Sequence, residues 1–107
     1  MKSTKSLIAE RLKKLEKFGY IVKSFGDNRR GRTGTKGWVD SVVFNVRTIV
    51  FIEVKTKDTN DSFYPEQKEV GKKLSSIATM NKHLHYIILK NLGDTEKFIE
   101  NLLGNKL

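Results

Sequence analysis

Apolar and β-branched residues gather in two short runs near the middle of the chain, at residues 39–44 and 48–55. Residues of this kind suit the pleated, half-buried surface of a sheet, so both runs are predicted to be strands. The short segment between them allows only a tight antiparallel turn, most simply a two- or four-residue loop centred between Val46 and Arg47. The middle of the chain is therefore predicted to be a β-hairpin.

The turn also determines which residues of this hairpin face each other. With the loop centred in this way, Asp40 lies directly opposite Glu53, and opposed residues share one face with Cβ atoms about 4.5–5.5 Å apart. Lys55 points to the same face, because side chains alternate along a strand. The other face of the second strand is wholly apolar and consists of Val50, Ile52 and Val54. Two acids and a lysine are thus predicted on one face, unless a one-residue bulge separates Asp40 from Glu53.

Helical periodicity occurs on both sides of the hairpin. The first helix is predicted over about residues 4–18, with Ser3 or Thr4 as its N-cap and Gly19 as its end. Its inward stripe consists of Ile8, Leu12, Leu15 and Phe18. A second helix is predicted from Pro65 to about Met80, because proline suits the first helical position. Its inward stripe consists of Gln67, Val70, Leu74 and Ile77.

Two further strands and a last helix complete the predicted fold. Residues 20–25 and 83–89 have strand composition, and Asp94 is predicted to cap a helix that stops at Gly104. The inward residues of that helix are Phe98, Ile99, Leu102 and Leu103. The order α-β-β-β-α-β-α predicts one α/β domain over residues 1–107, with a mixed α+β sheet of about four strands. Three strands form an antiparallel meander, and the crossover helix returns the fourth parallel to its neighbour.

Composition narrows the class of protein. The 107 residues are enough for one modest core, and no cysteine is present, which suits a reducing cytoplasm. No apolar run approaches the roughly 20 residues of a membrane helix, so we expect a soluble intracellular protein without a membrane partner. Lys and Arg number 21 against 12 Asp and Glu, a net charge of +9 that favours nucleic acid as the partner.

The basic charge is concentrated immediately before Asp40, in a glycine-rich segment at residues 26–37. Its cationic residues are Arg29, Arg30, Arg32 and Lys36. Arginine suits bidentate contacts with phosphate, so this segment is predicted to bind the nucleic-acid backbone beside the acidic pair. The alternative is a solvated basic loop with no such role.

A divalent cation is the natural occupant of the predicted cluster. Mg²⁺ prefers oxygen ligands and is often held by one or two carboxylates together with phosphate, so Asp40 and Glu53 are candidate ligands. Lys55 would then orient or deprotonate an attacking water, or stabilise the charge that develops on the phosphate. The alternative is an ordinary sheet face on which Lys55 forms a salt bridge worth about 0.2–1 kcal/mol.

These residues resemble a known family. Asp40, a hydrophobic hairpin, Glu53-Val54-Lys55 and then Gln67 near a helix start are similar to the PD-(D/E)XK nuclease superfamily, and most similar to its small VRR-NUC type. The VRR-NUC pattern begins Gly-x-Pro-Asp, which corresponds here to Gly37-Trp38-Val39-Asp40. Val39 replaces the usual proline, and Ser41 stands where the family prefers an aliphatic residue.

The resemblance implies a role for each matching residue. Asp40 and Glu53 would bind Mg²⁺, or Mn²⁺ in its place, and the backbone carbonyl of Val54 would be a third ligand. Lys55 would be the catalytic lysine, and Gln67 would support the site. Relatives often carry a further acid on the first helix, and Glu10 is the residue that would take this position. Glu10 could equally pair with a neighbouring lysine on a wet surface.

The resemblance also implies a restriction-endonuclease-like αβββαβ core with a C-terminal helix. The expected function is Mg²⁺-dependent DNA endonuclease activity, most similar to that of Holliday-junction resolvases, which act as homodimers on four-way junctions. Flap cutting and nicking are close alternatives. Two readings from other classes stay open, namely a non-catalytic basic nucleic-acid-binding module and an interaction protein for an acidic partner.

Overall fold

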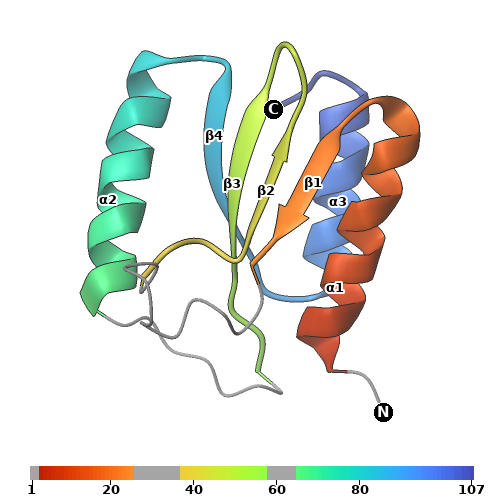
Figure 1. The fold of residues 1–107 in the computed structure, drawn as a ribbon, viewed down its shortest axis with the longest axis horizontal. Coiled ribbons are helices and arrows are strands. Elements are labelled where there is room, and N and C mark those ends of the chain that lie inside the picture. The colour runs from red at the N-terminus through yellow and green to blue at the C-terminus, as the bar shows by residue number, and fades with distance from the viewer. Residues whose placement is uncertain (1–2, 26–36, 58–64) are drawn as a thin grey trace.

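The computed structural model describes residues 3–25, 37–57 and 65–107. Within these ranges the chain forms a mixed α/β domain in which a four-stranded sheet is flanked by three α-helices (Figure 1). None of the described helices is long and apolar enough to cross a membrane. The elements in chain order are α1 (Thr4–Lys13), the 3-10 helix η1 (Lys14–Phe18), β1 (Ile21–Ser24), β2 (Ser41–Phe44), β3 (Ile49–Val54), α2 (Pro65–Met80), β4 (Leu84–Leu89) and α3 (Leu92–Leu103).

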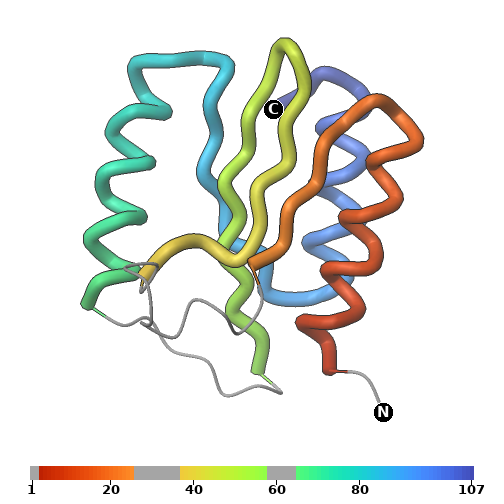
Figure 2. Tube along the Cα trace, viewed as in Figure 1, coloured from red at the N-terminus to blue at the C-terminus, as the bar shows by residue number. Residues whose placement is uncertain are grey.

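The sheet has the predicted topology. Its strands lie in the order β1-β2-β3-β4, with antiparallel pairing up to β3 and parallel pairing between β3 and β4. The Cα trace shows the meander and the return of β4 beside β3 after α2 (Figure 2). Ser41 pairs with Ile52 and Phe44 with Ile49, which is the register predicted from the length of the loop. The side chain of Asn45 accepts hydrogen bonds from the amides of Arg47 and Thr48 and so stabilises the turn.

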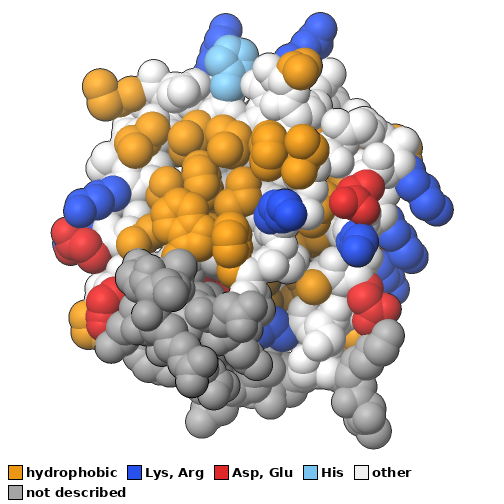
Figure 3. Space-filling view, in the orientation of Figure 1, with side chains coloured by type: hydrophobic (Ala, Val, Ile, Leu, Met, Phe, Trp, Pro, Cys, Tyr) orange, Lys and Arg blue, Asp and Glu red, His pale blue; other side chains and the backbone are white. Residues whose placement is uncertain are grey.

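Two hydrophobic clusters lie on opposite faces of this sheet. On one face, α1 and α3 pack against Val43, Val50 and Ile52. On the other face, Leu74 of α2 packs near Val42 and against partly buried aromatic residues. Apolar side chains gather visibly on this second face, over the strands beside α2 (Figure 3). The α1/α3 face is therefore closed, whereas the α2 face keeps part of its apolar surface accessible.

The helix boundaries differ from the predictions in two places. The predicted first helix ends as the 3-10 turn η1, because its last turn tightens before Gly19, which adopts a left-handed φ of 88°. The last helix begins three residues early, so the prediction that Asp94 is its N-cap was wrong. The cap is Asn91, whose side chain accepts a hydrogen bond from the Asp94 amide at 2.7 Å. The Asp94 carboxylate instead accepts a hydrogen bond from the Lys90 amide.

The last residue of each predicted inward stripe is exposed rather than buried. Phe18, Ile77 and Leu103 are between 41% and 60% exposed. Each lies in the last turn of its helix, where the apolar stripe leaves the core. The earlier residues of the α1 stripe, Ile8 and Leu12, are fully buried as predicted.

Candidate active site

Backbone hydrogen bonds to two other segments of the chain fix the position of Asp40. The Asp40 amide donates to the carbonyl of Ile52 at 3.0 Å, and the Asp40 carbonyl accepts from the amide of Phe25 at 2.9 Å. The residue is therefore fixed on both sides although it lies just outside the strand. Its side chain is 7% exposed, and Oδ2 accepts a hydrogen bond of 2.7 Å from the Val54 amide. The carboxylate consequently lies against the end of β3.

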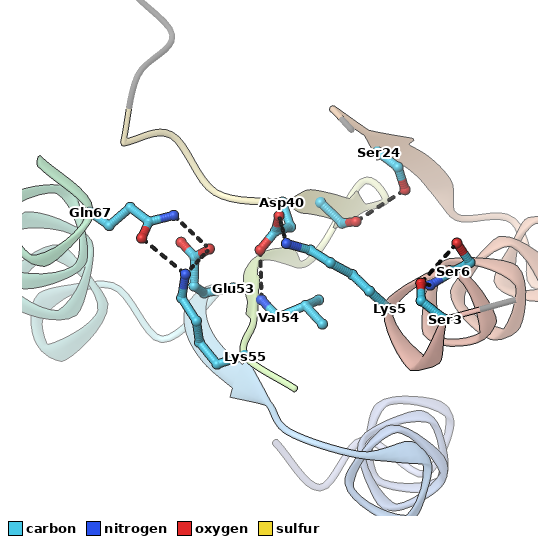
Figure 4. Close-up of polar contacts among 10 residues, drawn as sticks. Ser3, Lys5, Ser6, Ser24, Asp40, Glu53, Val54, Lys55 and Gln67 are labelled. Carbon is cyan, nitrogen blue, oxygen red and sulfur yellow. Dashed lines mark hydrogen bonds and ion pairs between the residues drawn. The ribbon is translucent and has the colours of Figure 1, made fainter. Parts of the chain in front are cut away.

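Glu53 and Lys55 lie at the same end of the sheet, and Gln67 of α2 contacts both. Glu53 is 1% exposed and Gln67 is 2% exposed. The Gln67 amide donates from Nε2 to Glu53 Oε1 at 3.3 Å, and Gln67 Oε1 accepts from Lys55 Nζ at 2.9 Å. Lys55 Nζ also lies 3.7 Å from Glu53 Oε1 (Figure 4). The three side chains thus form a closed polar network in which each contacts the other two.

The position of Gln67 follows from how α2 begins. A Cβ atom added at Gly37 would lie 2.6 Å from the Cβ of Glu66 and 2.8 Å from its carbonyl carbon, so the first turn of α2 packs directly on the glycine. Gly37 also has a left-handed φ of 86°, which few other residues adopt. This close contact brings the start of α2 to the chain that leads into Asp40, and Gln67 enters the site from there.

An unpredicted residue, Lys5, contacts the other acid. Its Nζ atom lies 3.2 Å from Asp40 Oδ1, and its side chain is 26% exposed. Figure 4 shows Lys5 reaching Asp40 from α1, while Lys55 and Gln67 approach Glu53 from the opposite side. Each acid therefore has its own ammonium group. Sequence reasoning missed Lys5, because a lysine in the first turn of a helix carries no pattern that distinguishes it from a solvated one.

The acids affect a neighbouring tyrosine. Burial raises the pKa of Tyr86 above its ordinary value of 10.0, and the negative charges of Glu53 and Asp40 raise it further. Tyr86 lies on β4 opposite Phe51 of β3, on the α2 face. Tyr86 therefore lies within electrostatic reach of both acids.

The structure brings together four of the predicted site residues, namely Asp40, Glu53, Lys55 and Gln67. It does not bring Glu10 to them, since Glu10 is exposed and lies about 140° around the helix axis from Lys5. The predicted phosphate-binding residues Arg29, Arg30, Arg32 and Lys36 lie outside the described residues.

The donor set fits a hard divalent cation only in part. Across residues 3–25, 37–57 and 65–107, no group of three or more His, Cys, Asp or Glu side chains could hold a metal ion. Two buried carboxylates are nevertheless sufficient for Mg²⁺, which commonly completes its shell with backbone carbonyls, water and substrate phosphate. The Val54 backbone adjoins Asp40 through its amide, and its carbonyl as a ligand stays a prediction.

Comparison of the chain with protein-family models, curated proteins and solved structures finds no match. The interpretation of the site therefore depends on its own geometry and chemistry.

Proposed function

We propose that this chain is a metal-dependent nuclease that hydrolyses phosphodiester bonds in DNA. The observation that carries the proposal is the pair of buried carboxylates, Asp40 and Glu53, beside a lysine that a buried glutamine holds in place. Burying a charged group is costly unless it is paired, and an apolar pair at these positions would stabilise the fold at least as well. The presence of four polar residues here is explained more simply by a catalytic role than by a contribution to stability.

Each residue has a role that its contacts support. Asp40, Glu53 and the Val54 carbonyl would hold Mg²⁺, with Mn²⁺ as a substitute. When bound there, the metal would acidify a water and neutralise phosphate charge. Lys55, whose side chain is only 8% exposed, would orient that water or stabilise the charge on the phosphate. Gln67 would fix the Lys55 ammonium through its 2.9 Å hydrogen bond.

The proposal extends to the fold family and the substrate. The order α-β-β-β-α-β, with an antiparallel meander and a parallel last strand, is the order expected for the restriction-endonuclease-like core of PD-(D/E)XK nucleases. The net charge of +9 suits a nucleic-acid substrate. By the VRR-NUC resemblance we further propose a homodimer that acts on four-way junctions, flaps or nicks, and the absence of cysteine suits a cytoplasmic location.

One observation favours a second candidate, a non-catalytic nucleic-acid-binding module. Asp40 and Glu53 each lie beside a lysine, so two negative and two positive charges balance without any metal. In that case the cluster would be structural. Binding to DNA would weaken steeply with salt. Divalent ions would neither cause cutting of the DNA nor stabilise the protein.

An incision assay separates the two candidates. The protein is incubated with end-labelled four-way junction, flap and plain duplex DNA in Mg²⁺, Mn²⁺ or EDTA. A nuclease cuts only with a divalent ion, and Lys55→Ala slows cutting by about 10²–10⁴-fold, the range for loss of a positioned acid or base. Lys57→Ala is the matched control, because Lys57 is exposed and lies two residues further along the chain. Salt-sensitive binding without incision of any substrate would instead support the binding module.

A further inference from the structure

The two lysines of the site differ in how they are held. The Lys55 side chain is 8% exposed and is bonded to Gln67 as well as lying near Glu53. The Lys5 side chain is 26% exposed and comes from the first turn of α1, on a chain of four methylene groups. Water therefore screens the charge of Lys5 more than that of Lys55, and the Lys5 ammonium is the easier of the two to rehydrate. Lys5 can therefore leave its position at a smaller cost than Lys55.

Lys5 also contacts the second carboxylate oxygen of Asp40, an acid that the proposed function assigns to the metal. The Val54 amide contacts Asp40 Oδ2 at 2.7 Å, whereas Lys5 Nζ lies 3.2 Å from Oδ1. A divalent cation that binds Asp40 through Oδ1 must approach this ammonium group. Two cations at one oxygen repel each other, so the ammonium has to move when the metal arrives.

We propose that Lys5 is a place-holding counter-ion for Asp40, which gives up the carboxylate to the incoming metal and then binds a phosphate of the nucleic acid. This inference rests on the proposed nuclease function. An ammonium displaced from Asp40 stays close enough to contact a phosphate bound to the same metal, where its charge is favourable. Lys5 thus balances the charge of the buried acid before metal binds, and it positions the substrate afterwards.

The first test measures metal binding without DNA. Mn²⁺ titration by calorimetry compares the wild type with Lys5→Met, which keeps an unbranched side chain of similar length but removes its charge. We expect Lys5→Met to bind Mn²⁺ about five- to tenfold more tightly, because the competing cation is gone. Lys13→Met is the matched control, since Lys13 is an exposed lysine of the same helix. We expect its affinity to stay within about twofold of the wild type.

The second test measures the substrate side of the exchange. At saturating Mn²⁺, Lys5→Met raises KM for DNA by about three- to tenfold, and kcat changes less, because a phosphate contact positions the substrate. Lys5→Arg keeps the positive charge, so it retains the Mn²⁺ affinity of the wild type and restores KM. Circular dichroism of each variant verifies folding, and Lys5→Arg keeps the proposal testable if Lys5→Met folds poorly.

The outcomes distinguish this inference from the proposed function. Equal Mn²⁺ affinity in the wild type and Lys5→Met overturns the place-holding role alone and leaves the nuclease proposal standing. The absence of Mn²⁺ binding in both proteins overturns the nuclease proposal and this inference with it. Tighter binding by Lys5→Met with an unchanged KM overturns the phosphate contact. Tighter binding combined with a raised KM supports the exchange.

Discussion

The two faces of β3 differ in the polarity of their side chains. Val50, Ile52 and Val54 point toward α1 and α3 and form a closed apolar layer. The opposite face begins with Ile49 and Phe51 and becomes polar at Glu53, where α2 contributes Gln67 in place of an apolar residue. Adjacent residues of one strand thus lie in two different environments, because side chains alternate across the sheet. Under the proposed function, the apolar layer against α1 and α3 would determine stability, and Glu53 with Gln67 on the α2 face would contribute to activity.

Removing core volume from the α1/α3 face tests the first half of this comparison. Leu12 is fully buried, so Leu12→Ala is expected to lower the free energy of unfolding by about 2–5 kcal/mol through lost burial and a new cavity. Urea denaturation measures the change. Leu103→Ala, the same substitution at a residue that is 41% exposed, is expected to lower it by less than about 1 kcal/mol. Slower incision by folded Leu12→Ala would contradict the division between the two faces.

The sequence was sufficient to predict this core and the hairpin register. Only a tight turn fits between the two strands, and a tight turn leaves few ways to pair them. The observed pairing of Ser41 with Ile52 matches the predicted register. The ladder ends at that pair and the Asp40 amide bonds to the Ile52 carbonyl, so the direct opposition of Asp40 and Glu53 stays a prediction. Gln67 was also predictable, because one polar residue began an otherwise apolar helical stripe. Local spacing alone determined both features.

Contacts between distant segments were not predictable in the same way. Lys5 meets Asp40 only because α1 lies across the sheet at a particular angle, and nothing in the spacing of charged residues encodes that angle. The same uncertainty made Glu10 the expected acid on this helix. The predicted start of α3 was wrong for a different reason. Asn91 and Asp94 are both good N-cap residues. Gly93 between them is typical of a loop, so the sequence did not favour the earlier cap.

A substitution on the α2 face tests the second half of the comparison. Gln67→Met preserves size but removes both hydrogen bonds that hold Lys55 and Glu53. Incision is expected to slow by about 10–100-fold, as when a residue that orients a catalytic group is lost. The free energy of unfolding is expected to fall by only about 1 kcal/mol. Single-turnover cutting and urea denaturation measure the two effects, with the exposed neighbour substitution Lys68→Met as the control. A loss of stability without a loss of rate would make Gln67 structural.

The close contact between α2 and β4 provides a further test of the α2 face. A Cβ atom added at Gly71 would lie 2.8 Å from Oη and 3.2 Å from Cζ of Tyr86. Alanine gains about 1 kcal/mol of helix propensity over glycine, but overpacking costs about 1–3 kcal/mol, so Gly71→Ala is expected to lower stability by about 1 kcal/mol. Thermal or urea unfolding measures it. In a Tyr86→Phe background the nearest clash is gone and the cost of Gly71→Ala should shrink; an undiminished cost would contradict this origin.

The smallest expected effect concerns pH and the field of the acids on the α2 face. Burial and the charges of Glu53 and Asp40 raise the pKa of Tyr86 above 10.0. Above that pH the unfolded chain ionises this tyrosine while the folded protein keeps it neutral. The contribution to stability is therefore complete below about pH 10 and is lost as pH rises through the folded pKa.

Urea denaturation across this alkaline range should consequently show a steeper loss of stability in the wild type than in Tyr86→Phe. Equal slopes of stability against pH would mean that folding does not change the pKa of Tyr86. Glu53→Gln separates the two causes, because it removes one charge and leaves the burial of Tyr86 in place. A titration of tyrosinate absorbance should then give a lower pKa for Tyr86 than in the wild type. An unchanged pKa would assign the whole shift to burial and would remove the electrostatic distinction between the two faces at this residue.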